Sequence, residues 1–272
     1  MTTNRTFLNL VLLSGDAQTQ LQAAKEAGFD EVEIWQESIE SADGGATAVR
    51  ERAQQLGMGF TNCQVLRDFA GAPLTLRAEK RQEAQRFFRL AQAIGCDTVQ
   101  APACTRDDCQ AALIDEDLRW LSAEAARHGL RIMYEPMAWS RVDNRLEPTW
   151  RRLERLDLPN VGLVVDLFHI AARGDDASVL ESIPAERIYE VQLCDMVVQP
   201  SPQDKEAIMA LAKHRRQLPG AGMIDIDSFI DKLKSANYQG PIGIEVFNDD
   251  LKRLPPHEAA RQAYAALRRF WP

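Results

Sequence analysis

The sequence lacks the cysteine pattern of a disulfide-stabilised or zinc-ribbon protein. Its five cysteines stand singly, and no Cys-x-x-Cys pair occurs. An odd number of separated thiols is typical of a protein from a reducing compartment. The segment Met1–Arg5 leads directly into FLNLVLLS, which we take as too short for the apolar region of a signal peptide or for a membrane span. We therefore expect a cytoplasmic protein with free thiols.

Long apolar runs and an excess of positive charge are also missing. No apolar run approaches the ~18 residues that a membrane helix needs. The chain has 32 lysines and arginines against 40 aspartates and glutamates, for a net charge of −8. Because nucleic-acid binding depends on a basic face, we expect neither a nucleic-acid nor a membrane partner. The sequence leaves open whether the chain forms a homo-oligomer.

What the 272-residue sequence does contain is a regular alternation of short β-rich runs and longer helical patterns. The runs lie at 7–14, 31–35, 58–66, 98–103, 131–136, 161–168, 187–195 and 241–248. Such alternation predicts a parallel sheet of the α/β class. The first run is not followed by the Gly-x-Gly-x-x-Gly motif that favours a doubly wound sheet. We therefore predict a single-domain (β/α)8 TIM barrel over residues 1–272.

The connection after the seventh run, at about 196–224, is much longer than a usual strand-to-helix loop. In a barrel this connection lies over the carboxyl ends of the strands, where active sites are found. We expect a lid or substrate clamp there, with a surface insertion as the alternative.

Four successive runs carry an oxygen-bearing side chain near their carboxyl ends: Glu135, Asp166, Gln192 and Glu245. In a barrel these ends converge on one pocket, and three carboxylates cannot all stay ionised there without a cation. Carboxylate and carboxamide oxygens suit one hard divalent ion such as magnesium, manganese or cobalt. Glu33 has a similar position on the second run, where either a role in the site or a pair with an arginine is open.

A histidine and two arginines stand near the expected pocket. His169, three residues after Asp166, is a candidate general base, with a buried structural histidine as the alternative. Arg67 follows the third run, and Arg216 lies in the long connection with His214 close by. Guanidinium groups bind carboxylates in a bidentate manner. Arg67, Arg216 and the neighbouring His214 are therefore candidate contacts for an anionic substrate. Surface salt bridges are the alternative.

Together with these four residues, the segments GFDEVEIW, GCDTVQAP, LPGAGMIDIDSFI and YQGPIGIEVFND resemble the sugar-phosphate isomerase/epimerase family of xylose-isomerase-like TIM barrels. The resemblance covers essentially the whole chain. Within that family, RDFAG, YEPMAW, VVDLFH, VQLCD and GIEVFNDD are most similar to the bacterial 3-dehydroshikimate dehydratases. Two positions depart from the dehydratase pattern: Met137 replaces a histidine found in some members, and Ala212 replaces a serine before the loop arginine.

The resemblance implies a metal-dependent lyase that converts 3-dehydroshikimate, a small anionic hydroxy-ketone, to protocatechuate through an enolate. It makes Glu135, Asp166, Gln192 and Glu245 the metal ligands and Arg67, His169 and Arg216 substrate contacts. His169 is then the first candidate for the base, and a glutamate of the ligand set, such as Glu135, is the second. The alternative is an isomerase or epimerase that acts on a keto sugar or a hydroxypyruvate-like substrate, because both reactions begin with the same proton removal.

Overall fold

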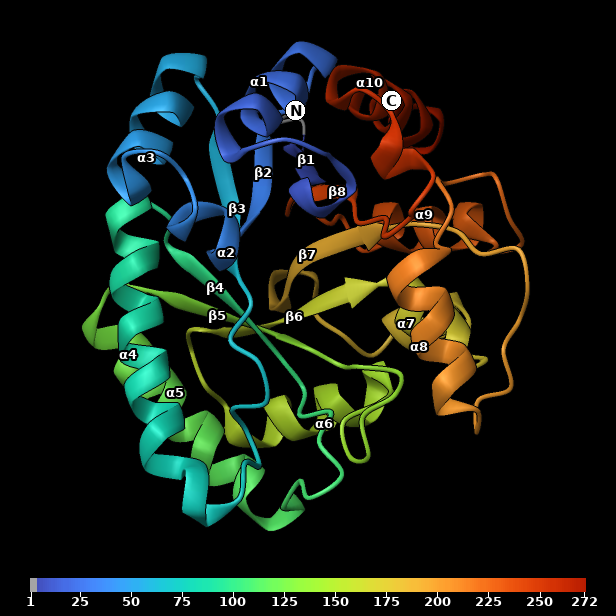
Figure 1. Ribbon diagram of the computed structural model, residues 1–272. Coiled ribbons are helices and arrows are strands. Elements are labelled where there is room, and N and C mark those ends of the chain that lie inside the picture. The colour runs from blue at the N-terminus through green and yellow to red at the C-terminus, as the bar shows by residue number, and fades with distance from the viewer. Residues whose placement is uncertain (1–3) are drawn as a thin grey trace.

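Eight parallel strands close into a barrel in the order β1 to β8 in the computed structural model, which describes residues 4–272 (Figure 1). The barrel closes where Thr6, Phe7 and Leu8 of β1 pair with residues of β8. The strands are β1 (Thr6–Asn9), β2 (Glu31–Trp35), β3 (Gly59–Gln64), β4 (Thr98–Pro102), β5 (Arg131–Glu135), β6 (Val161–Asp166), β7 (Ile188–Leu193) and β8 (Ile242–Ile244). The predicted TIM barrel is confirmed.

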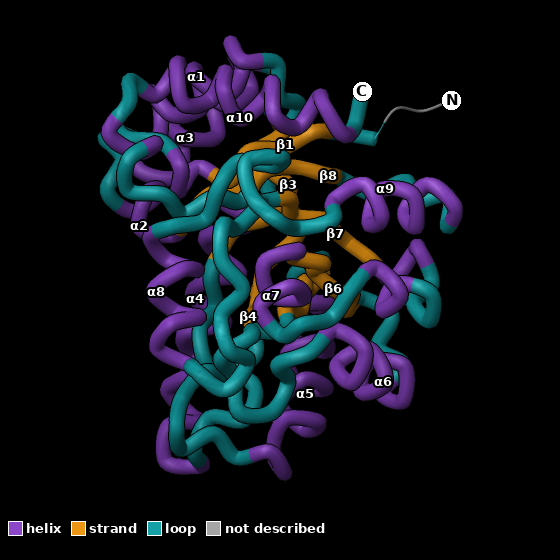
Figure 2. Tube along the Cα trace, turned by 90° about the vertical axis from the view of Figure 1, so that its right-hand side faces the viewer, coloured by secondary structure: helices purple, strands orange, loops and turns teal. Residues whose placement is uncertain are grey.

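Within residues 4–272, ten α-helices accompany the strands, and most of them lie around the outside of the barrel (Figures 1 and 2). They are α1 (Ala17–Ala27), α2 (Gln36–Glu40), α3 (Gly45–Leu56), α4 (Arg77–Ile94), α5 (Ile114–Arg127), α6 (Leu146–Leu156), α7 (Leu167–Ala172), α8 (Lys205–His214), α9 (Ile226–Ser235) and α10 (Pro256–Phe270). The arrows of β6 and β7 point toward the side that holds α7 and α8 (Figure 1). This side is the carboxyl-terminal mouth of the barrel.

Several strands are shorter than the sequence predicted, and in two of them, β1 and β6, the strand ends at a side-chain cap. The run at 7–14 ends as a strand at Asn9, whose Oδ1 accepts a hydrogen bond from the Val11 N–H at 3.0 Å and begins a short 3-10 helix. The run at 161–168 ends at Asp166, whose Oδ1 accepts from the Phe168 N–H at 2.7 Å and caps α7. Asparagine and aspartate commonly begin helices in this way.

Side chains alternate between the two faces of each strand. On β2, Val32 and Ile34 pack outward against the helices, whereas the carboxyl group of Glu33 hydrogen-bonds other strands inside the barrel. The apolar layer between strands and helices includes Leu8, Ile34, Val99, Ile132, Val165 and Ile244. The barrel interior therefore carries the polar residues, and the apolar core lies around it.

Asp195, just after β7, anchors the long connection at 196–224. Its carboxylate is fully buried and accepts hydrogen bonds of 2.8–3.1 Å from the backbone N–H groups of Met196, Gly220, Gly222 and Ile224. A Cβ on Gly222 would lie 2.3 Å from the Met196 carbonyl oxygen, so this position has no room for a side chain. The connection is thus fixed at both of its ends, with α8 and Arg216 between them.

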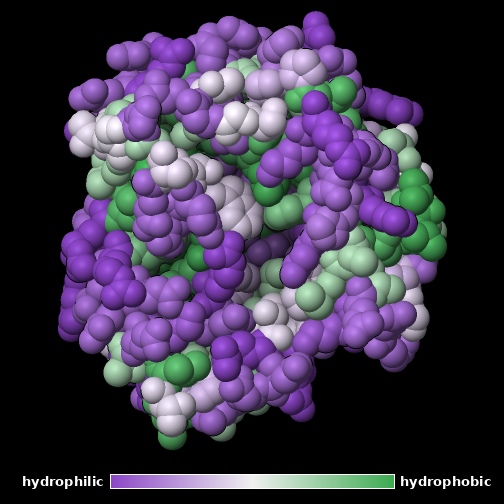
Figure 3. Space-filling view, in the orientation of Figure 1, coloured by the Kyte–Doolittle hydropathy of each residue, from purple (hydrophilic) through white to green (hydrophobic). Residues whose placement is uncertain are grey.

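Hydrophilic side chains cover most of the face seen in Figure 3. Among residues 4–272, no helix combines the length and apolar character needed to cross a membrane. All five cysteines are free thiols, as predicted.

Candidate metal centre and substrate cavity

A cavity of about 420 Å³ opens at the carboxyl-terminal mouth of the barrel. Strands β3, β4 and β5 contribute Gln64, Gln100 and Glu135 to its lining, and Glu245 follows β8 directly. The aromatic side chains of Trp35, Trp139 and Phe247 form apolar parts of its wall. The cavity therefore combines apolar surface with a few converging polar groups, as small-molecule sites do.

Glu135, Asp166 and His169 form a buried cluster beside this cavity. One ligand atom from each lies within 4.8 Å of the others, close enough for one ion to contact all three. The His169 Nε2 atom is 3.4 Å from Glu135 Oε1 and 3.5 Å from Asp166 Oδ2. The second oxygen of Glu135 accepts a hydrogen bond of 2.7 Å from Gln100 Nε2.

Arg216 joins two of the predicted ligands. Its Nη1 lies 2.8 Å from Asp166 Oδ2 and 3.0 Å from Glu245 Oε2, and its Nε donates to the Ala212 carbonyl at 3.0 Å. Although burial opposes the charge, Asp166 and Glu245 raise the pKa of Arg216 above its usual value. Burial raises the pKa of Glu245, and the arginine acts in the opposite direction. Within residues 4–272, the Nη2 atom of Arg216 has no hydrogen-bond partner.

The proton of His169 can be assigned from its surroundings. Its Nδ1 accepts a hydrogen bond of 3.1 Å from the backbone N–H of Ala138, so in the neutral ring the proton is on Nε2. Nε2 is buried and faces the two carboxylates. In this tautomer the ring presents an N–H donor toward Glu135 and Asp166, and the role of His169 as general base stays a prediction.

Gln192 is fully buried inside the barrel, opposite Asp166 in the pairing of β6 with β7. Its Nε2 donates to Glu33 Oε1 at 2.8 Å and to Glu190 Oε1 at 3.0 Å. Asn62 Nδ2 bridges the same two carboxyl groups, at 2.8 Å and 2.9 Å. Glu33 thus pairs with Glu190 and not with an arginine. Burial raises the pKa of Glu190 to about 8, and burial together with Glu190 raises that of Glu33.

The donor set fits a hard divalent cation. Glu135, Asp166 and Glu245 supply carboxylate oxygens, and Gln192 Oε1 is buried with no hydrogen-bond partner among the described residues. A buried carbonyl oxygen without a partner is costly, so an oxygen in that position fits a ligand to a cation. Arg216 contacts one oxygen of Asp166 and one of Glu245, and is thus a fixed positive charge beside this donor set.

The other predicted substrate contacts differ in their placement. Arg67 lines the cavity, forms an ion pair of 3.0 Å with Glu37, and has its Cζ 5.4 Å from the centre of the Trp35 ring. His214 pairs with Asp249 at 3.2 Å and is not among the residues that line the cavity. Its neighbour Lys213 does line the cavity and has no ion-pair partner among residues 4–272.

Sequence reasoning missed several polar residues of the site. Asn9 holds Glu245 Oε1 with a hydrogen bond of 2.7 Å, and Gln100 holds Glu135. Gln64 is 1% exposed and lines the cavity, and its buried Nε2 has no hydrogen-bond partner within the described part of the chain. All three stand near the carboxyl ends of their strands. The signal that identified the four predicted ligands would therefore have found these residues on β1, β3 and β4.

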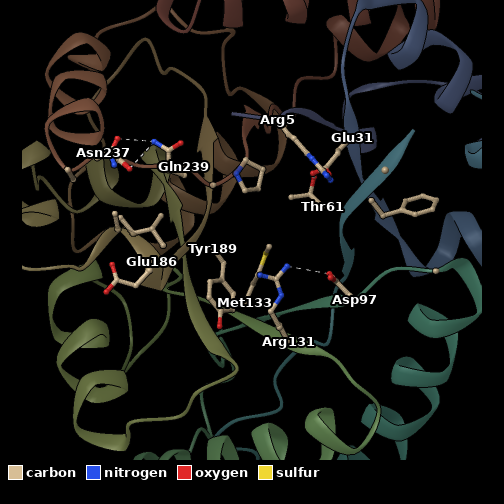
Figure 4. Close-up of a pocket in the computed structure, with 18 residues that line it drawn as sticks. Arg5, Glu31, Thr61, Asp97, Arg131, Met133, Glu186, Tyr189, Asn237 and Gln239 are labelled. Atoms are coloured by element: carbon tan, nitrogen blue, oxygen red, sulfur yellow. Dashed lines mark hydrogen bonds and ion pairs between the residues drawn. The ribbon is translucent and has the colours of Figure 1, made fainter. Parts of the chain in front are cut away.

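A larger hollow of about 890 Å³ lies at the opposite, amino-terminal mouth (Figure 4). Its two arginines are already paired: Arg5 contacts Glu31, and Arg131 lies 3.3 Å from Asp97. In this hollow no buried side-chain atom of the described residues is without a hydrogen-bond partner. The cavity at the carboxyl-terminal mouth is therefore the better candidate for chemistry.

Fold and site together define a TIM barrel with a candidate metal centre at its carboxyl-terminal mouth. The model of the xylose isomerase-like TIM barrel family matches residues 21–270. The chain belongs to this family.

Two curated relatives match nearly the whole chain. A 3-dehydroshikimate dehydratase of Pseudomonas aeruginosa is 34% identical over 259 residues, and one of Pseudomonas putida is 32% identical over 263 residues. Each alignment covers 94% of this chain, but the chain spans only 40% of the length of either relative. An inosose isomerase of Halalkalibacterium halodurans is 27% identical over 144 residues, which are 53% of this chain and 49% of that protein.

Solved structures agree on the fold. A fusion of a xylose isomerase-like TIM barrel with a 4-hydroxyphenylpyruvate dioxygenase superposes with a TM-score of 0.91 at 30% identity, over 98% of this chain and 42% of the fusion protein. The IOLI protein, solved with a bound zinc atom, superposes with a TM-score of 0.84 over 96% of both chains. At 21% identity this second likeness shows the fold alone.

Proposed function

We propose that this chain is a divalent-metal-dependent lyase that dehydrates 3-dehydroshikimate to protocatechuate. The observation that carries the proposal is that one cavity is lined by two carboxylates of the proposed ligand set and by cationic side chains, with Asp166 close to one of those carboxylates. A cation on the first would attract a ketone oxygen, and the second would attract a carboxylate. The identity of 32–34% to two proteins named as 3-dehydroshikimate dehydratases supports the choice of substrate.

The proposed metal ligands are Glu135, Asp166, Gln192 and Glu245, and the ion is magnesium, manganese or cobalt. When bound, the cation supplies a positive charge beside the ketone oxygen of the substrate. Gln100 and Asn9 orient two of the carboxylates from behind, as neighbouring groups do in many metal sites.

Cationic groups at the cavity would hold the ring carboxylate of the substrate. Arg67 and Lys213 line the cavity, and Arg216 retains a free Nη2 while its Nη1 binds the carboxylates. The side chains of Trp35 and Trp139 offer flat apolar surface to a six-membered ring. Together these contacts would fix the ring relative to His169.

The proton steps follow from the orientation of His169. A carboxylate of the ligand set, with Glu135 as our candidate, removes the proton from the carbon next to the ketone. His169 donates a hydrogen bond from Nε2 to the departing hydroxyl group, and the protonated carboxyl group gives its proton to that group, which leaves as water; tautomerisation of the ring gives the catechol. Because His169 Nε2 is 3.4 Å from Glu135 Oε1, the imidazole N–H lies beside the carboxyl group that carries this proton.

The direct test is to load the chain with Mn²⁺ or Mg²⁺, add 3-dehydroshikimate and follow protocatechuate by its ultraviolet absorbance. We expect product formation that stops when a chelator removes the metal and resumes when metal is added back. Absence of product, with turnover of a keto sugar or inosose under the same conditions, would instead identify an isomerase or epimerase.

A ligand variant makes the assignment specific. Glu245→Gln should reduce turnover by at least about 100-fold and weaken metal binding, because a neutral side chain replaces a ligand charge. The same change at Glu31, which belongs to the amino-terminal mouth, should leave both properties unchanged. Normal turnover by Glu245→Gln would remove this residue from the ligand set.

A further inference from the structure

The barrel interior contains a polar cluster that the proposed reaction does not use: Glu33, Asn62 and Glu190. All three side chains are fully buried, at 0% exposure, and none of them lines the cavity at the mouth. Two carboxyl groups in the centre of a barrel are costly, since each loses its water on burial. Their position therefore requires a physical reason.

The hydrogen bonds of this cluster converge on Gln192. The amide nitrogen of Gln192 donates one hydrogen to Glu33 at 2.8 Å and the other to Glu190 at 3.0 Å. Burial raises the pKa of both carboxyl groups, and Glu33 and Glu190 are hydrogen-bonded to each other, so the proton that the pair holds lies between them. The oxygens that face Gln192 therefore accept, and since an amide oxygen cannot donate, they pair with the NH2 end of the side chain. Its Oε1 is consequently turned away from the pair, buried and without a partner among the described residues.

Asn62 keeps the two carboxyl groups in register with each other. Its Nδ2 contacts Glu33 Oε1 at 2.8 Å and Glu190 Oε2 at 2.9 Å. The two carboxyl groups are therefore bridged on both sides by amide NH2 groups, one from β3 and one from β7. This arrangement leaves Gln192 a single favourable orientation.

We infer that Glu33 and Glu190 are positioning residues that orient the Gln192 carboxamide with its oxygen toward the metal centre. The inference rests on the proposed function, because it takes Gln192 as a ligand. A carboxamide presents either an oxygen or an NH2 group, and only the oxygen can bind a cation. A histidine or carboxylate ligand would not need this selection between two ends.

The test measures the affinity of chelator-stripped protein for Mn²⁺ by calorimetry, together with the thermal midpoint of the stripped protein. Glu190→Gln places an NH2 group against that of Gln192 or of Asn62, and Glu33→Leu removes the oxygen to which both amides donate, so we expect Mn²⁺ affinity to fall about 10- to 100-fold in each variant. The thermal midpoint should not fall correspondingly, because a buried carboxyl group is removed in each variant. Two variants are used so that failure of one to fold still leaves the other.

A reciprocal exchange distinguishes positioning from a general structural effect. In Glu190→Gln/Gln192→Glu the new glutamine can donate to the new carboxylate while its oxygen still accepts from Asn62, and the carboxylate presents oxygen in either orientation. We expect this double variant to recover most of the affinity that Glu190→Gln loses. Glu31→Gln, two residues before Glu33 on β2, is the matched control and should bind Mn²⁺ like the wild type.

The outcomes separate this inference from the proposed function. Wild-type affinity in both single variants, or no recovery in the double variant, overturns the positioning role and leaves the metal centre intact. Failure of the wild-type protein itself to bind Mn²⁺ overturns both.

Discussion

Among single residues, amide side chains hold several of the predicted ligands in position. Gln100 and Asn9 each hold one oxygen of a predicted ligand, and Gln192 is held by two carboxyl groups. Gln64 is the exception, because it lines the cavity and its buried Nε2 has no partner in the described part of the chain. A buried polar group without a partner is unfavourable unless a ligand satisfies it. We take Gln64 to be a contact for a substrate hydroxyl group.

Replacing Gln64 with leucine should therefore raise the KM for 3-dehydroshikimate about tenfold, the effect of one hydrogen bond, and leave Mn²⁺ affinity unchanged. Gln64→Glu should raise it further, because the added charge repels an anionic substrate. Steady-state kinetics measures both. The same change in Gln92→Glu, on the outer surface, serves as the control, and an unaltered KM in both Gln64 variants would exclude the contact.

At the scale of an element, the long connection at 196–224 depends on one buried carboxylate. Asp195 accepts from the N–H groups of residues at both ends of this segment, and Arg216 between them reaches Asp166 and Glu245. The described connection is thus an anchored loop with its own helix, α8. The sequence predicted its length and its place over the mouth, whereas α8 and the anchor were not predicted.

Asp195→Asn should loosen this element, because the amide has one oxygen where the carboxylate has two and its NH2 group faces backbone N–H groups. We expect the free energy of unfolding to fall by about 2 kcal/mol and trypsin to cleave the segment faster. Urea denaturation and gel analysis of the digest measure these effects. Asp225→Asn is the control, since asparagine caps α9 as well as aspartate does; equal digestion of both variants would contradict the anchoring role.

At the scale of the whole molecule, the proposed ligands stand at or near the carboxyl ends of β5 to β8. A metal ion bound to them would therefore link these four strands. A cation that binds the folded chain and not the unfolded chain adds about 2.7 kcal/mol at one hundred times its dissociation constant. Mn²⁺ should therefore raise the thermal midpoint measured by scanning calorimetry, in proportion to the logarithm of its concentration. Glu245→Gln should lose most of this increase, and an equal increase in that variant would place the ion elsewhere.

The fold was predictable from the sequence because each barrel unit is a short local pattern: a β-rich run, a helix and often a glycine after the helix. Gly28, Gly57 and Gly95 are the C-caps of α1, α3 and α4, in the left-handed conformation. The site was predictable only in part. Strand-end carboxylates are visible in a sequence, but the bond from Ala138 N–H that sets the proton of His169 depends on a loop 31 residues away.

The same reasoning explains the two residues whose placement differed most from expectation. His214 was expected to contact the substrate. It is instead the last residue of α8, and its ring pairs with Asp249. Glu33 was expected to bind an arginine or join the site, and instead it meets Glu190 across the barrel through Asn62 and Gln192. Contacts across a barrel interior depend on the register of strands that are far apart in sequence, which local patterns do not encode.

The hydrogen bonds from Gln192 to Glu33 and Glu190, which Asn62 also bridges, have an evolutionary consequence. If this ligand position changed to histidine, a single substitution would leave two carboxyl groups without their amide donor and an imidazole in contact with both. Positions 33, 62, 190 and 192 should therefore vary as a set across the family: chains with histidine at 192 should differ at the other three, and chains with glutamine should retain them. An alignment in which these four positions vary independently would show that the barrel tolerates a glutamine ligand at 192 without Glu33, Asn62 and Glu190.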